Sequence, residues 1–223
     1  PELTVDGLKV PPLETVIWAP SQPFTSLVKL YHEAVKVEFG SARADRVNVI
    51  QTIEGANSEI SYEAVRLEGF ADRKLALMMA GPMTLVSPSD EGELVTVTVG
   101  GGEARDMDLG AVIDVYDPDA YIGGRGDMTW RSGMVYADYK DIVIEAPGAR
   151  IVIESVVSED LNVRPPPVSF AQFMDAVMTN PEMPEWQIAN FTKRYVPSML
   201  GAWSIGHLGV SGLTIESPDI DRM

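Results

Sequence analysis

The stretch from Asp141 to Glu154, DIVIEAPGARIVIE, decides the fold class of this chain. It contains two β-branched runs, Ile142 to Ile144 and Ile151 to Ile153, separated by Pro147-Gly148. Such runs favour strands and the Pro-Gly pair favours a chain reversal, so the stretch predicts a β-hairpin. Neither run alternates with polar residues, which predicts that both faces are covered. We therefore expect the hairpin in the core of a two-layer sandwich.

The turn of this hairpin is predicted to be loose. Proline followed by glycine favours type II geometry, which splays the flanking strands, whereas two-residue hairpins use types I′ or II′. We therefore expect a loop of four or more residues between the two runs.

Alternation of apolar and polar residues predicts strands on the N-terminal side of this hairpin. The clearest case is Leu94 to Val99, where threonine alternates with valine. Val47 to Ile53 and Ile60 to Leu67 also alternate, and the residues from Glu54 to Ser58 include Gly55 and Asn57. Because glycine and asparagine favour turns, these segments predict a second hairpin.

Other strand patterns are weaker. Leu3 to Val10 is a broken pattern that ends at Pro11-Pro12 and could form an arm. Strands are also expected at Thr15 to Ala19 and Leu27 to Phe39, the second of them half-buried with His32 as a hydrogen-bonded structural residue. The glycines between Trp203 and Ile215 predict a bent closing strand.

The spacing of apolar residues changes from a period of 2 residues to one of 3.6 residues after Pro165-Pro166-Pro167. Ser169 and Gln172 have the spacing of a capping box, and Phe170, Phe173, Met174, Val177 and Met178 fall on one helical stripe, which predicts a helix. A second helix is expected after Pro184 and should end before Pro197.

Two composition breaks, Gly100 to Gly102 and Pro165 to Pro167, leave the domain organisation open. One interpretation is a single β domain over 1–223 with long loops. The other adds an inserted or appended β subdomain at about 103–164. Both agree on a mainly β chain with one or two short helices late in the sequence.

The composition excludes several classes of site. The chain has no cysteine and only two histidines, so disulfides, Cys-ligated metals, thiol catalysis and a His-rich metal centre cannot be built from it. The segment Ala202 to Gly206 resembles a nucleophile elbow, but His207 lies too close to Ser204 to act as an independent base. We predict no catalytic and no cofactor-binding residues, and hence no enzyme.

Two loops are candidates for binding. Asp114, Asp117 and Asp119 could present oxygen ligands to a calcium ion, although a solvated acidic loop explains them as well. Arg125-Gly126-Asp127 is a tripeptide that animal cell-surface receptors recognise when a loop displays it, and a turn with two opposite charges is the simpler interpretation.

The charge balance argues against a nucleic-acid partner. Asp plus Glu number 33 against 17 Lys plus Arg, for a formal net charge of -16, whereas phosphate binding needs a basic face. Arginine outnumbers lysine, a trend of proteins adapted to high salt. An ordinary acidic mesophilic protein explains the balance equally well.

In its size, its β-rich pattern with late helices and its acidic, Arg-over-Lys composition, the chain resembles the upright single β-barrel major capsid proteins of haloarchaeal icosahedral viruses with an internal membrane. The resemblance implies a jelly-roll β-barrel, a second β domain as a turret, and pseudo-hexameric capsomers formed with other copies and a related capsid subunit. It also implies contact with the internal viral membrane, location in the virion, and no small-molecule substrate.

A β-sandwich binding module is the alternative class. Its loops, such as Asp117 to Asp127, would recognise a carbohydrate or receptor, with Trp130 as a stacking platform. The chain starts at Pro1, which fits a removed initiator Met, and its first residues lack the pattern of a signal peptide, so synthesis in the cytoplasm is expected.

If the acid excess is an adaptation to salt, stability should rise between low salt and about 1 M salt, where the Debye length falls to about 3 Å and carboxylate repulsion is screened. Circular dichroism during heating would measure the midpoint across this range. A midpoint that is flat or falls with salt would remove the argument for a halophilic source.

Overall fold

The computed structural model describes residues 2–53, 56–89, 92–122, 125–180 and 182–217, and these form a mainly β chain, as predicted. Most strands belong to one antiparallel sheet. Its strands are β1 (Leu3–Asp6), β2 (Phe39–Ile53), β3 (Ala56–Ala71), β4 (Lys74–Ala80), β5 (Met83–Pro88), β6 (Leu94–Val99), β7 (Gly101–Asp108), β10 (Arg131–Ala146), β11 (Ala149–Val163), β12 (Trp203–Ser211) and β13 (Thr214–Glu216).

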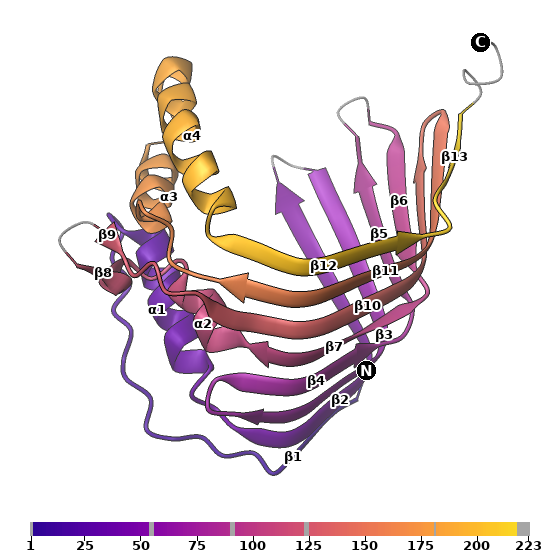
Figure 1. Ribbon diagram of the computed structural model, residues 1–223, viewed down its shortest axis with the longest axis horizontal. Coiled ribbons are helices and arrows are strands. Elements are labelled where there is room, and N and C mark those ends of the chain that lie inside the picture. Colours follow the sequence, from indigo (N-terminus) through magenta and orange to yellow (C-terminus); the bar gives the residue numbers. More distant parts are fainter. Residues whose placement is uncertain (1, 54–55, 90–91, 123–124, 181, 218–223) are drawn as a thin grey trace.

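The helices gather at one end of this sheet (Figure 1). They are α1 (Pro23–Ala34), α2 (Leu109–Asp114), the 3-10 turn η1 (Pro118–Ala120), α3 (Phe170–Thr179) and α4 (Glu185–Leu200). A separate two-stranded ribbon, β8 (Tyr121–Ile122) with β9 (Arg125–Gly126), lies beside them.

The sheet is bent into two arms, which we call the lower arm and the upper arm (Figure 1). The lower arm has the order β1-β2-β3-β4-β7-β10-β11-β12. In the upper arm β5 and β6 take the places of β4 and β7, and β13 takes the place of β12, because β5 pairs with β3, β6 with β10 and β13 with β11. Four long strands, β2, β3, β10 and β11, run through both arms.

Residues of unusual backbone conformation lie along the bend. Ala64 in β3 and Asp141 in β10 have φ of 49° and 52°, the left-handed region in which bulges occur. Between β4 and β5, Gly81 donates its N–H to the carbonyl of Glu63 at 2.8 Å. Between β6 and β7, Gly100 donates to the carbonyl of Lys140 at 2.9 Å. Hydrogen bonding therefore continues across the bend.

The central hairpin is confirmed, but its predicted loop is wrong. Ala146 pairs with Ala149, so Pro147-Gly148 alone makes the turn. Gly148 has φ of 72°, the value that the second central position of a type II turn requires. The strands on either side, β10 and β11, remain paired over more than a dozen residues, so the cost of a turn type that does not match their twist is outweighed by the ladder.

The predicted core position of this hairpin is also wrong for the single chain. Ile142 to Ile144 and Ile151 to Ile153 are only half-buried. No residue of the upper arm within the described ranges is fully buried, because no second layer of the chain covers either face there. The continuous apolar runs thus indicate that neither face of the hairpin is polar. They do not indicate that a second layer of the same chain covers it.

The other strand predictions divide into two groups. The hairpin of β2 and β3 is confirmed, with Val49 opposite Ile60, as are β6 and the bent closing strand, which breaks at Gly212 with φ of 61°. The centre of the predicted turn, residues 54–55, lies outside the described residues. Thr15 to Ala19 forms no strand.

Leu27 to Phe39 was predicted as a strand, but most of it belongs to α1. Pro23 occupies the first turn, where its fixed φ suits a helix and its missing N–H costs nothing. The alternation of Val35, Val37 and Phe39 reflects the exit from the helix and the start of β2. His32 therefore lies on a helix, beside the acidic loop described below.

The late helices are confirmed, with two corrections. Ser169 is the N-cap residue of α3, but its buried hydroxyl makes no capping hydrogen bond, so the capping box is wrong. Helix α4 continues through Pro197 to Leu200. Because proline has no N–H, the helix lacks the hydrogen bond that position 197 would otherwise donate.

The strands that flank the predicted domain boundaries share the sheet. Strands β10 and β11 and most of β7 fall within 103–164, and these strands pair with β4, β6 and β12 outside that range. The hydrogen-bonded ladder therefore runs across both composition breaks.

Two small clusters of buried apolar side chains lie at the helical end of the lower arm. One contains Ala111, Val115, Val163 and Ala202, and the other contains Val35, Phe70 and Leu75. Beside them an aromatic group joins the helices to one another. Its members are Phe24, Tyr116, Phe170, Phe173, Phe191 and Tyr195, with ring centroids 5.1–6.2 Å apart along the chain of contacts.

A buried carboxylate from α3 caps the start of α1. Asp175 accepts hydrogen bonds from the N–H of Phe24 at 2.8 Å, the N–H of Thr25 at 3.1 Å and the hydroxyl of Thr25 at 2.6 Å. The α1 N-cap residue, Gln22, makes no side-chain cap, so Asp175 supplies the acceptor from 150 residues away. A negative charge at this position also favours the positive end of the helix.

Replacing Asp175 by Ala should lower the free energy of unfolding by about 1–3 kcal/mol, because two N–H groups lose their acceptor in a buried site. Asp175→Asn should lose less, since the amide oxygen still accepts. Urea denaturation would measure both, with Glu182→Ala, an exposed acid nearby, as the control. Equal losses for Asp175→Ala and Glu182→Ala would contradict the capping role.

Candidate functional site

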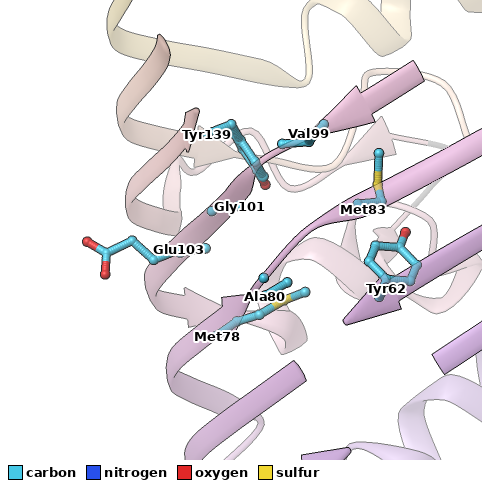
Figure 2. A pocket seen from close by; sticks show the side chains of 11 residues that line it. Tyr62, Met78, Ala80, Met83, Val99, Gly101, Glu103 and Tyr139 are labelled. Carbon is cyan, nitrogen blue, oxygen red and sulfur yellow. The ribbon is translucent and has the colours of Figure 1, made fainter. Parts of the chain in front are cut away.

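The best-formed pocket of the described residues lies on the bend (Figure 2). It has a volume of about 280 Å³, at the small end of the range for ligand sites. Its walls come from β3, β4, β5, β6, β7 and β10. The lining residues are Tyr62, Met78, Ala80, Gly81, Met83, Val99, Gly101, Gly102, Glu103, Ala104 and Tyr139.

Three consecutive glycines shape this pocket. A Cβ on Gly102 would lie 2.7 Å from the ring of Tyr139 and 2.9 Å from the carbonyl of Asp138. A Cβ on Gly100 would lie 2.8 Å from that of Asp141, and one on Gly101 would lie 3.2 Å from the carbonyl of Ala80. The glycine run therefore permits close approach of strands at the bend.

The pocket is suited to apolar contact and not to catalysis. Figure 2 shows Tyr62, Met78 and Met83 around the hollow, while the carboxylate of Glu103 points away from it. Among the described lining residues Glu103 is the only acid, and none is basic. Methionine side chains adapt their shape to a contacting surface, so the pocket could receive an apolar side chain.

The acidic loop makes the most concentrated polar group in the described part of the chain. Potential ligand atoms of His32, Asp114 and Asp117 lie within 4.8 Å of one another. Nε2 of His32 is 3.1 Å from Oδ2 of Asp117, close enough for an ion pair, although the N–H is not aligned for a hydrogen bond. Asp119 contributes its backbone N–H, which donates to Asp117 at 2.8 Å. Its carboxylate is not part of the group.

Two arginine side chains bind the carboxylate of Asp114. Its Oδ1 accepts from Arg73 at 2.6 Å and its Oδ2 from Arg131 at 3.0 Å. Two guanidinium groups thus balance the two carboxylates of the cluster, and a metal ion would have to compete with them. We interpret the cluster as an ion-pair network that holds α1, α2 and β10 together.

The environment of Asp117 fits this interpretation. Burial opposes ionisation of its carboxyl, but contact with His32 and the amide of Asp119 outweighs the burial and holds the pKa of Asp117 below its usual range. Sequence analysis missed His32 as a partner, because 85 positions separate it from Asp117 and no local pattern joins them.

The remaining acids of this region have separate structural roles. Asp108 caps α2 by accepting from the N–H of Ala111 at 2.8 Å. Asp106 lies in β7 with φ of 51°. Asp106, Asp108 and the carboxylate of Asp119 therefore lie outside the described group of His32, Asp114 and Asp117.

The tripeptide Arg125-Gly126-Asp127 and Trp130 lie close to the acidic loop in the sequence. Asp127 is exposed but accepts from the N–H of Thr129 at 3.0 Å and from Arg131 at 2.9 Å. These contacts, chiefly those with Thr129, hold the pKa of Asp127 below its usual range. The guanidinium of Arg164 lies 4.2 Å from the centre of the Trp130 ring. The stacking platform expected of a binding module is thus occupied on one side by a cation–π contact.

The serine of the segment that resembles a nucleophile elbow lies within a strand. Ser204 is part of β12, opposite Asn162 of β11, and is not at a sharp strand-to-helix turn.

Exposed apolar side chains are the most extensive feature of the surface. They occur on the N-terminal segment, on both ends of the sheet, and on α4. Large examples with more than half of their surface exposed are Leu3, Leu8, Val10, Ile17, Trp18, Tyr31, Ile50, Leu94, Trp186, Leu200, Leu208, Val210, Leu213 and Ile215.

Comparison with known proteins identifies no relative. No family model matches the chain, and neither the curated proteins nor the solved structures contain a significant match. In the described residues, no helix has both the length and the hydropathy needed to cross a bilayer. The function of this chain can therefore be inferred only from its own surface and fold.

Replacing Gly102 by Ala should destabilise the bend by roughly 1–3 kcal/mol, because the new Cβ meets a backbone carbonyl and the Tyr139 ring. Thermal and urea unfolding would measure the loss. Gly209→Ala in β12 is the matched control, since its Cβ would meet only the end of the His207 side chain, at 3.3 Å. Equal stability of the two variants would show that the glycine run is not required for packing at the bend.

Proposed function

We propose that this chain is a structural subunit that assembles with further copies of itself. The main support for this proposal is the large solvent-accessible surface area of the chain. The chain exposes 13905 Å² for a mass of 24.3 kDa, whereas a compact monomer of that mass exposes about 10,000 Å². The excess corresponds to several interfaces of about 800 Å² per partner.

The distribution of apolar residues supports the same proposal. The upper arm is a single layer whose β-branched residues are half-buried or exposed on both faces. A stable monomer rarely exposes large contiguous apolar patches, so such surfaces mark contacts with other proteins or membranes. Packing of a neighbouring copy against this arm would supply the missing second layer.

Within this class, we propose a subunit of a virion shell, the major capsid protein implied by the sequence resemblance. The acidic composition and the mainly β fold support it. A jelly roll needs two facing sheets built from Greek keys, whereas the described strands form one bent sheet. The shell proposal therefore relies on the exposed surface, and a barrel-like double layer would arise between subunits. A related subunit and an internal membrane are further proposed partners.

The binding module is the alternative outcome. A binding module would need an aromatic ring on an exposed loop with both faces free to stack on a ligand. Arg164 covers one face of the Trp130 ring. The bend pocket offers it no charged group beyond Glu103, which points outward.

Sedimentation velocity and electron microscopy in low and high salt should show the full chain as a multi-subunit particle. Deleting residues before Pro11 should leave the circular dichroism spectrum unchanged and impair assembly, because this segment is exposed and β1 is a short edge strand. A stable monomer at high protein concentration in both salts would overturn the proposed function. Glycan-array binding by that monomer would then favour the binding module.

A further inference from the structure

The lower arm of the sheet ends in two edges that have no hydrogen-bonded neighbour among the described strands. One edge is β12. The other is the segment Leu3 to Lys9, in which β1 pairs with β2 and Lys9 continues the ladder through a bridge to Glu38. The two edges lie on opposite sides of the arm (Figure 1).

The directions of these two edge strands are complementary. Every pairing in the lower arm is antiparallel, and the arm has eight strands from β1 to β12. Strand direction alternates across the arm, so the first and the last strand run in opposite directions. If a second copy continued the sheet, its β12 would lie antiparallel to β1 of the first copy. The continued sheet would keep its ordinary hydrogen-bonding pattern.

The β12 edge lacks the features that usually prevent pairing, whereas the other edge is short and includes Asp6 and Lys9. Proteins protect free edges with lysine, proline, inward charges or a covering loop. β12 has nine residues, with the sequence WSIGHLGVS, and contains no acid, lysine, arginine or proline. In a chain with 22% charged residues, about two charges would be expected in such a segment.

Apolar side chains flank both edges. On β12, Ile205, Leu208 and Val210 are 48%, 58% and 53% exposed. On the other edge, Leu3 and Leu8 are 70% and 55% exposed. Joining the edges would bury side chains of the same kind from both copies, as well as satisfy the free backbone groups.

We propose that copies of this chain associate head to tail, with β12 of one copy paired antiparallel to the Leu3 to Lys9 edge of the next. The inference rests on the proposed function and specifies one of its interfaces. Because the two edges differ, each copy keeps one free edge after pairing, and the series grows into a ring or a filament. The N-terminal arm thereby obtains a defined docking surface.

Lysine substitutions test the two edges separately. Leu3→Lys with Val5→Lys changes one edge, and Leu208→Lys with Val210→Lys changes the other. Each pair is exposed, so folding should persist, as circular dichroism would verify. Ser21→Lys with Leu30→Lys adds the same charge at exposed sites away from both edges and from the upper arm, and is the control.

Both edge variants should lose the large species in sedimentation velocity, while the control keeps it. An equimolar mixture of the two edge variants should form pairs of one copy of each, because one intact edge of each kind remains. Loss of assembly in the β12 variant alone would overturn the proposal in favour of β12 pairing with itself. If both edge variants kept the large species, head-to-tail pairing would be wrong although the chain still assembles. If the unmodified chain were a monomer, the proposed function itself would be wrong.

The absence of cysteine from the chain provides a second test. A chain with both Leu3→Cys and Leu208→Cys should form a ladder of disulfide-linked oligomers on oxidation. The two positions are separated by seven strand spacings of about 4.8 Å along the sheet, too far for a bond within one chain. With Leu3→Cys alone, oxidation should give no ladder. A double variant that gives only dimers would contradict head-to-tail pairing.

Discussion

The bend of one antiparallel sheet is the constraint on which the rest of this structure depends. The β2–β3 and β10–β11 pairings continue across the bend, whereas β3 exchanges β4 for β5 and β10 exchanges β7 for β6 there. Ala64 and Asp141 adopt left-handed conformations there, and Gly100 to Gly102 let neighbouring strands approach closely. Larger side chains at these glycines would collide with backbone atoms, so the arms could not meet at this angle.

The bend separates two different environments. At the helical end of the lower arm, small buried clusters, the aromatic group and the Asp175 cap hold the helices on the sheet. The upper arm is a single layer with no fully buried residue in its described part. Hydrogen bonds satisfy its backbone, but its apolar side chains have no covering partner within the chain. The resulting surface is larger than that of a compact monomer of this mass, and the proposal of an assembling subunit is based on this excess.

Local patterns predicted the elements whose causes are local. The β-branched runs of the central hairpin, the alternation of Leu94 to Val99 and the helical stripe after Ser169 all formed as expected. Predictions failed where the deciding contacts are distant. Helix α1 is capped by Asp175 and not by its own N-cap residue, and His32 meets Asp117 only because α1 packs beside the acidic loop. The candidate acids at 114, 117 and 119 gave no local sign that arginines would occupy Asp114.

The sequence by itself determined that the chain is mainly β, that its central hairpin reverses at Pro147-Gly148, that helices follow the three prolines, and that no thiol or multi-histidine chemistry is available. These properties follow from residue type and period. Tertiary structure alone decided that most strands form one bent sheet, that the triple glycine marks a close approach of strands, and that the apolar hairpin is left half-covered. The physical reason is that strand pairing and burial depend on which distant segments meet, and an apolar run has the same pattern whether its cover comes from its own chain or from a neighbour.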